Sequence, residues 1–252
     1  MQMTTDVLET STGIFKKVAS TSSTATADRT PKHIVLEEGL TVYLGGAGMT
    51  GGYIDDQIKS LRMVGISGAV VGRNTEGQYA DAVAGVNKHR YRLKKINGMS
   101  DTGPYSVEAD WSLKSLGVSR SFPTGGQFNL IGYSFGSLVA AQSALYYADK
   151  GQAIDYLVLI GSPISEEMLG EVRQQSLIEH VVILDLKEHG DPIHAGMSFF
   201  DLAEHAPLLG SQMTESSERK EGVGHFYYGI DGPSGEQRRL ELAKFLYAQG
   251  LR

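Results

Sequence analysis

The chain has 252 residues, of which 41% are hydrophobic and 21% are charged, a balance typical of globular proteins. Its formal net charge of −6 at pH 7 repels nucleic acids and anionic membrane surfaces, so we predict no nucleic-acid partner. No apolar run approaches the length needed to span a bilayer, so we predict no stable membrane insertion. The sequence contains no cysteine, which excludes disulfides, thiolate metal sites and cysteine nucleophiles together.

The N-terminal part of the sequence bears on localisation and on where the folded part begins. It lacks the basic region and apolar core of a secretory signal, so we expect a cytoplasmic protein or one exported without a cleaved signal peptide. Residues 1–31 are rich in Ser and Thr and are predicted to form a flexible arm. Residues 13–20 (GIFKKVAS) also fit a short docked strand or helix. Residues 32–252 contain no clear linker and are predicted to form one domain.

The first half of this domain opens with a β-α-β pattern. Residues 40–44 (LTVYL) predict a buried strand that runs into a glycine-rich loop at 45–52. Helical spacing of apolar residues follows at 53–63, and residues 68–71 predict a second buried strand. Residues 76–97 have a partly helical pattern.

The second half continues the alternation of strand and helix. Its predicted elements are helices at 107–116, 135–148, 165–175 and 235–251, a loop at 119–126, and strands at 128–131, 154–160 and 178–186. The strands are nearly continuous apolar runs, which is typical of strands that are buried on both faces. The sequence therefore predicts an α/β fold with a mostly parallel central sheet and helices on both of its faces.

One short stretch of this second half carries a chemical motif. Residues 132–136 (GYSFG) fit G-x-S-x-G, a pattern that places a serine on a sharp turn between a strand and a helix. Ser134 is therefore the candidate nucleophile. The flanking glycines are explained if the tight turn brings them against neighbouring backbone, where a Cβ would clash. The alternative is an ordinary buried joint between a strand and a helix.

A serine nucleophile needs a base to accept its proton and a carboxylate to orient that base. His225, in a glycine-rich loop before the last helix, is the candidate general base. Asp191 follows the strand at 178–186 and lies where open α/β sheets build their sites, so it is the candidate acid. Asp185, inside that strand, is its rival, and a turn aspartate before proline is the alternative reading of Asp191.

An acyl-transfer site also needs hydrogen-bond donors for the developing oxyanion. The backbone N–H of Phe135, at the start of a helix, is one candidate. The second candidate donor is Gly46 or Ala47, in the loop after the first strand. No grouping of His, Asp and Glu has the spacing of a metal site, so we predict none. The candidate substrate contacts are Met49, Tyr133 and His194.

With these motifs in order, residues 36–250 resemble the α/β-hydrolase superfamily. The resemblance is carried by GGAG at 45–48, GYSFG at 132–136, GDPI at 190–193 and GVGHF at 222–226. It implies the α/β-hydrolase fold and hydrolysis of a carboxylic ester or a thioester through an acyl-enzyme, without a cofactor. Many members have His-Gly at the oxyanion loop, whereas this chain has Leu44 followed by two glycines.

Relatives that act on lipids often carry a lid, and two segments of this chain are candidates for one, at 97–125 and at 194–215. Met197, Phe200 and Leu202 lie in the second segment and suit acyl chains, or equally the core of a helix. The substrate class on this reading is a small-molecule or lipid acyl ester.

A second reading of the sequence points to a different enzyme class. Residues 46–51 (GAGMTG) fit the dinucleotide fingerprint G-x-G-x-x-G. Tyr146 and Lys150 form Y-x-x-x-K after Ser134, a set that resembles short-chain dehydrogenases, and Arg73 is placed to meet an NADP phosphate. On one continuous helix, however, Ser134 and Tyr146 stand roughly 18 Å apart and cannot share a substrate. The hydrolase is therefore favoured over the reductase, with a non-catalytic binding module third.

Overall fold

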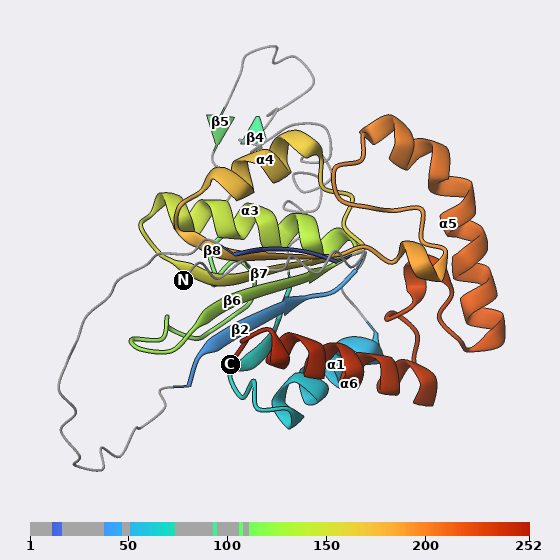
Figure 1. Ribbon diagram of the computed structural model, residues 1–252, viewed down its shortest axis with the longest axis horizontal. Helices are drawn as coiled ribbons and strands as arrows, with labels where there is room; N and C mark the ends of the chain where they lie inside the picture. Colours follow the sequence, from blue (N-terminus) through green and yellow to red (C-terminus); the bar gives the residue numbers. More distant parts are fainter. Residues whose placement is uncertain (1–11, 17–37, 47–50, 74–92, 95–105, 108–110) are drawn as a thin grey trace, which may run out of the picture.

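The central feature of the computed structural model is a six-stranded sheet in the order β1-β8-β7-β6-β2-β3 (Figure 1). The structure describes residues 12–16, 38–46, 51–73, 93–94, 106–107 and 111–252. The strands of the sheet are β1 (Thr12–Lys16), β2 (Leu40–Leu44), β3 (Ala69–Gly72), β6 (Phe128–Tyr133), β7 (Ile154–Ile160) and β8 (Ile178–Leu184). Strands β3, β2, β6, β7 and β8 are all parallel, which confirms the predicted α/β class. A separate pair joins β4 (Leu93–Lys94) and β5 (Ser106–Val107).

The helices cover both faces of the sheet. In Figure 1, α1 and α6 lie on one face and α3 and α4 lie on the other, while α5 stands beyond the carboxyl ends of the parallel strands. The helical elements are α1 (Gly52–Met63), α3 (Phe135–Asp149), α4 (Glu166–Gln174), α5 (Phe199–Arg219) and α6 (Pro233–Ala248), with short 3-10 turns η1 (Lys187–His189) and η2 (Gly224–Phe226).

The apolar strands explain this layered arrangement. Along β7, Leu157 and Leu159 pack with the helices α3 and α4, whereas Val158 and Ile160 pack with α1 and α6. Successive side chains of a strand point to opposite faces, so a strand without polar interruptions needs cover on both. The two hydrophobic cores of the protein therefore follow directly from the continuous runs in the sequence.

The first strand differs from the predicted flexible arm at 1–31. Residues 12–16 form β1, which pairs antiparallel with β8 from Thr12 opposite Leu184 to Lys16 opposite His180. An extended segment in this position satisfies the backbone N–H and C=O groups along an otherwise unpaired edge. Docking as a strand, the less favoured alternative, therefore applies to these five residues, and the rest of 1–31 lies outside the described residues.

The helix predicted at 107–116 is wrong, because Val107 ends strand β5 and residues 113–117 form turns. The Ser115 N–H donates to the Ser112 hydroxyl, and the Ser115 hydroxyl donates to the Ser112 carbonyl. Such local side-chain bonds compete with a helical backbone. The apolar residues Trp111, Leu113 and Leu116 are nonetheless buried against α3. Most of the partly helical pattern at 76–97 lies outside the described residues.

Candidate active site

Ser134 occupies a strained turn between β6 and α3. Its φ of 55° and ψ of −125° place a non-glycine residue in a rarely populated backbone conformation. A Cβ on Gly132 would lie 2.3 Å from the Ser137 Cα, and one on Gly136 would lie 2.2 Å from the Leu44 carbonyl oxygen. Both distances are impossible for real Cβ atoms, so the reason predicted for the two glycines of GYSFG is confirmed.

The structure brings the predicted serine, histidine and aspartate into one hydrogen-bonded chain. The Ser134 Oγ lies 2.6 Å from the His225 Nε2, and the His225 Nδ1 lies 2.8 Å from the Asp191 Oδ2. The Asp191 side chain is fully buried and the His225 side chain is 9% exposed. The second carboxylate oxygen of Asp191 accepts the N–H of Ile193 at 2.8 Å. Both oxygens of the buried carboxylate therefore have donors, and one fixes the imidazole ring.

The rival acid, Asp185, has different partners. Its Oδ1 accepts the Ala195 N–H at 3.1 Å, and its Oδ2 lies 3.9 Å from the Lys187 Nζ. Burial raises the pKa of the Asp185 carboxyl, while the Ala195 N–H and the Lys187 charge act in the opposite direction. The structure thus places Asp191, and not Asp185, against His225.

The backbone of His225 is held by side chains on both sides. Its N–H donates to the Gln212 Oε1 at 3.0 Å, and its carbonyl accepts a hydrogen bond from the Tyr133 hydroxyl. Burial raises the pKa of Tyr133 well above its ordinary value, so the phenol stays protonated and able to donate. Tyr133 is buried. The Tyr133 hydroxyl thus holds the base loop, and the substrate contact predicted for Tyr133 stays a prediction.

The predicted oxyanion donors have different outcomes. Phe135 is the first residue of α3 and directly follows Ser134, at the amino end of the helix. Gly46 lies beside the nucleophile, since a Cβ there would be 3.6 Å from the Ser134 Cβ. The Gly46 N–H donates instead to the Tyr53 hydroxyl at 2.8 Å, so it is not available as predicted. The other two predicted positions in this loop, Ala47 and Met49, lie outside the described residues.

The structure gives the positions of His194 and of the described parts of the two candidate lid segments. The His194 Nδ1 lies 3.3 Å from the Pro192 carbonyl oxygen, and the contact of His194 with substrate stays a prediction. In the candidate lid at 194–215, Met197 is buried, Leu202 packs on the core and Phe200 is 83% exposed. In the other candidate lid, at 97–125, the apolar residues of 111–125 pack in the same hydrophobic core as α3. The role of either segment as a lid stays a prediction.

Three features that connect the acid and base loops were missed from the sequence. A Cβ on Gly161, after β7, would lie 3.1 Å from the Asp191 Oδ2 and 3.5 Å from the His225 ring. The His189 and Tyr227 rings stack with centroids 3.6 Å apart. The third feature is the hydrogen bond from the His225 N–H to the Gln212 Oε1. The glycine directly after a strand was a usable signal for the first, whereas nothing local in the sequence marks the other two.

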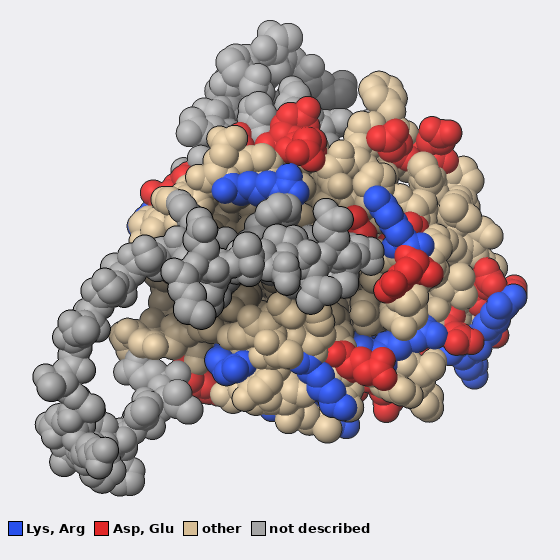
Figure 2. Space-filling model, viewed as in Figure 1, with Lys and Arg blue, Asp and Glu red and all other residues tan. Residues whose placement is uncertain are grey.

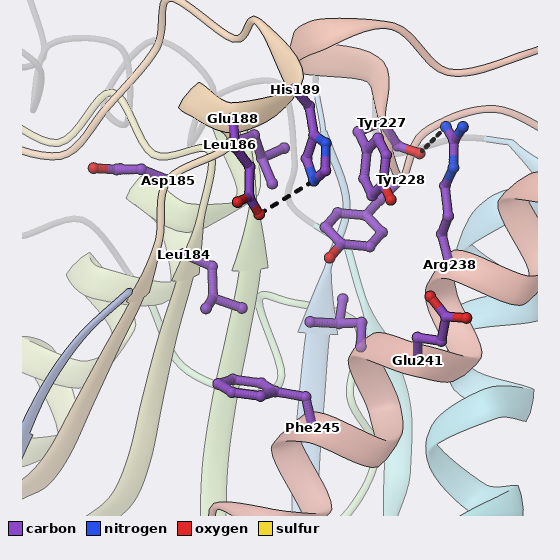
Figure 3. Close-up of a pocket in the computed structure, with 11 residues that line it drawn as sticks. Leu184, Asp185, Leu186, Glu188, His189, Tyr227, Tyr228, Arg238, Glu241 and Phe245 are labelled. Atoms are coloured by element: carbon purple, nitrogen blue, oxygen red, sulfur yellow. Dashed lines mark hydrogen bonds and ion pairs between the residues drawn. The ribbon is translucent and has the colours of Figure 1, made fainter. Parts of the chain in front are cut away.

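A cavity of about 240 Å³ lies behind these loops on the α6 side of β8 (Figure 3). Leu184 and Phe245 lie at one end of it, and the stacked rings of His189 and Tyr227 lie at the other end. Leu242 also lines the cavity. Burial lowers the pKa of His189, which favours the neutral imidazole in this stack. None of the three residues of the hydrogen-bonded chain lines this cavity. It therefore backs the acid and base loops rather than opening onto Ser134.

The residues of the reductase reading are not brought together. Helix α3 runs without interruption from 135 to 149, so Tyr146 stands roughly 18 Å along the helix from Ser134. The Lys150 Nζ lies 4.2 Å from the centre of the Tyr146 ring, a local contact at the far end of α3.

The wider surface adds two findings. Basic side chains are interspersed with acidic ones on the face shown in Figure 2, without one concentrated basic patch. Within the described ranges, no helix combines the length and apolar character needed to cross a membrane. In the same part of the chain, no group of three or more His, Asp or Glu side chains is arranged to hold a metal ion.

Comparisons with protein-family models, with curated proteins and with solved structures give no match to this chain. The geometry of the site must therefore carry the functional argument by itself.

Proposed function

We propose that this protein is a serine hydrolase that cleaves carboxylic esters through an acyl-enzyme intermediate. The observation that carries the proposal is the chain from the Ser134 Oγ to the His225 Nε2 at 2.6 Å, and from the His225 Nδ1 to the buried Asp191 carboxylate at 2.8 Å. A nucleophile, a base and an orienting acid at hydrogen-bonding distance are the groups that acyl transfer needs.

The proposed reaction has two halves. In the first, the Ser134 oxygen attacks the ester carbonyl while the His225 Nε2 accepts the serine proton; the ester C–O bond then breaks and His225 returns the proton to the leaving alcohol. In the second, water attacks the acyl-enzyme by the same route, releasing the carboxylic acid and restoring Ser134. Asp191 accepts a hydrogen bond from the His225 Nδ1–H and stabilises the imidazolium that forms in each half.

The oxyanion of each tetrahedral intermediate needs two donors in this proposal. The Phe135 N–H is the first, since it stands directly after the nucleophile at the amino end of α3, where the helix dipole favours negative charge. Because the Gly46 N–H is bonded to Tyr53, we assign the second donor to Ala47 of the two predicted positions. With the order Ser134, Asp191, His225 along a parallel sheet, these features support an α/β-hydrolase fold.

Covalent labelling of Ser134 tests the proposal directly. A fluorophosphonate probe should label the wild-type protein and a Ser217→Ala control, whose exposed serine lies far along α5. Ser134→Ala should lose the label, and its rate of p-nitrophenyl ester hydrolysis should fall at least about 10³-fold, because no other group replaces the nucleophile.

Continued labelling of Ser134→Ala would contradict the assignment, and NADPH binding by thermal shift would favour a reductase. A panel of esters, thioesters and phospholipids then ranks the substrate classes.

A further inference from the structure

Helix α5 projects from the body and is joined to it mainly by two buried polar side chains. Of its residues 200–219, Gln212 and Ser216 are buried and the others are half-buried or exposed. The Ser216 Oγ accepts the Val223 N–H at 3.0 Å, so it contacts the loop that carries His225. Figure 1 shows α5 at the edge of the protein, with η2 between it and the sheet. The anchoring of α5 is therefore polar, specific and directed at the base loop.

The Gln212 carboxamide bridges the acid loop and the base loop. Its Nε2 donates to the Gly190 carbonyl at 2.8 Å, one residue before Asp191, and its Oε1 accepts the His225 N–H at 3.0 Å. The amide lies directly on Gly224, where an added Cβ would come within 2.2 Å of the Nε2. The glycine before His225 is therefore required by the presence of the Gln212 amide as well as by its own positive φ of 54°.

The bridge reinforces other contacts between the same two loops. The His189 and Tyr227 rings, one from each loop, are stacked at an interplanar angle of 4°, as their parallel planes in Figure 3 show. The two loops are therefore joined by the amide bridge and the ring stack as well as by the Asp191–His225 hydrogen bond. Of these contacts, the amide bridge is the one that bonds to the backbone next to Asp191 and to the backbone of His225 itself.

We propose that Gln212 is a positioning residue, which holds the Asp191 and His225 loops in the register that lets the acid orient the base; this inference rests on the hydrolase function proposed above. A carboxamide suits the task because it offers one donor and one acceptor side by side. Glutamate at the same position offers two acceptors and would repel the Gly190 carbonyl. Methionine has a similar length but offers neither a strong hydrogen-bond donor nor a strong acceptor. Helix α5 is therefore a component of the active site and not an independent appendage.

Four substitutions separate the bridging role of Gln212 from simple space filling. Gln212→Met and Gln212→Glu should each lower kcat for a short p-nitrophenyl ester by about 10- to 100-fold with little change in KM, because a misplaced base slows chemistry more than binding. Gln237→Met makes the same change on the exposed face of α6 and should leave kcat unchanged. Ser216→Ala removes the other polar anchor of α5 and should lower stability while keeping kcat within about two-fold.

A spectroscopic readout tests the same inference without turnover. The Nδ1 proton of a histidine bonded to a buried carboxylate gives a resolved low-field proton resonance, which His225→Ala assigns by its absence. The resonance should persist in the wild type, Gln237→Met and Ser216→Ala, and should be lost or broadened in folded Gln212→Met. If the wild type proves unreactive to ester and probe, the proposed function fails, whereas this resonance still decides whether Gln212 holds His225 on Asp191.

Two outcomes would overturn the inference. One is a folded Gln212→Met that keeps the wild-type kcat and the low-field resonance. The other is a Ser216→Ala variant that loses as much kcat as Gln212→Met at an equal loss of stability, since that would mean that any loosening of α5 has the same effect.

Discussion

Two aspartates at the carboxyl end of β8 show how position, and not residue type, assigns a chemical role. Asp191 is fully buried with its Oδ2 on the His225 ring, whereas Asp185 accepts the Ala195 N–H and faces Lys187. We predict that Asp191→Asn lowers kcat/KM by about 10⁴-fold with the fold intact, because the Ile193 N–H retains the amide oxygen and the amide NH2 then donates to the His225 Nδ1, which favours the wrong tautomer. Steady-state kinetics on a short ester measures this loss.

Asp185→Asn is the matched control and has a pH signature of its own. Its kcat/KM should stay within about three-fold of the wild type, and a loss comparable to that of Asp191→Asn would mean that the acid is misassigned. Because burial raises the pKa of Asp185, the folded protein holds this proton more tightly than the unfolded chain does. This group therefore costs the wild type stability as pH rises from about 3.9 through the raised value, and Asp185→Asn should lack that contribution. Urea unfolding across that window measures the difference.

At the scale of single elements, the turn that carries Ser134 depends on glycines for steric reasons. A Cβ on Gly136 would lie 2.2 Å from the Leu44 carbonyl oxygen, so β2 and α3 could not approach as they do. We predict that Gly136→Ala destabilises the protein by about 3 kcal/mol or prevents folding. Gly170→Ala, in the interior of α4 with open space around the new Cβ, should instead stabilise it by roughly 0.5–1 kcal/mol. Thermal unfolding compares the two, and similar effects would refute the steric account.

The elements also show which parts of the fold the sequence could predict. Strand β7 and helix α4, with its Ser165 cap accepting the Met168 N–H, were predictable because their signals are local. The strand order, with β2 between β3 and β6, is set by packing between distant segments and has no local signal.

The residues of the candidate site also divide into those that sequence motifs predict and those that have no local signal. Ser134, Asp191 and His225 stand in motifs whose order along the chain is informative, so the structure could be expected to bring them together. Gln212 is a single polar residue in a helix, and its two partners lie 22 and 13 residues away in sequence. The pairing of β1 with β8 likewise depends on an edge that exists only once the sheet has formed.

At the scale of the whole molecule, one buried arginine joins the helices α1 and α6 to the segment that follows His225. The Arg239 Nε donates to the Asp56 carboxylate at 2.7 Å, and its Nη1 donates to the carbonyls of Tyr228 at 2.9 Å and Ile230 at 2.7 Å. Arg239 is 1% exposed and the Asp56 side chain is 20% exposed, so the ion pair is mostly shielded from water. Its loss therefore leaves a carboxylate and two carbonyls without their donor at a single point in the core.

We predict that Arg239→Met destabilises the protein by about 3 kcal/mol, because removing one partner of a buried ion pair leaves the other charge uncompensated. Arg173→Met is the matched control, since Arg173 pairs with Glu166 on the exposed surface at 3.4 Å and should contribute less than about 1 kcal/mol. Urea denaturation of both variants gives the two free energies of unfolding. Equal values would mean that the Arg239 contacts add no more than a surface pair, and that the segment after His225 is held by the apolar packing of α1 against α6 instead.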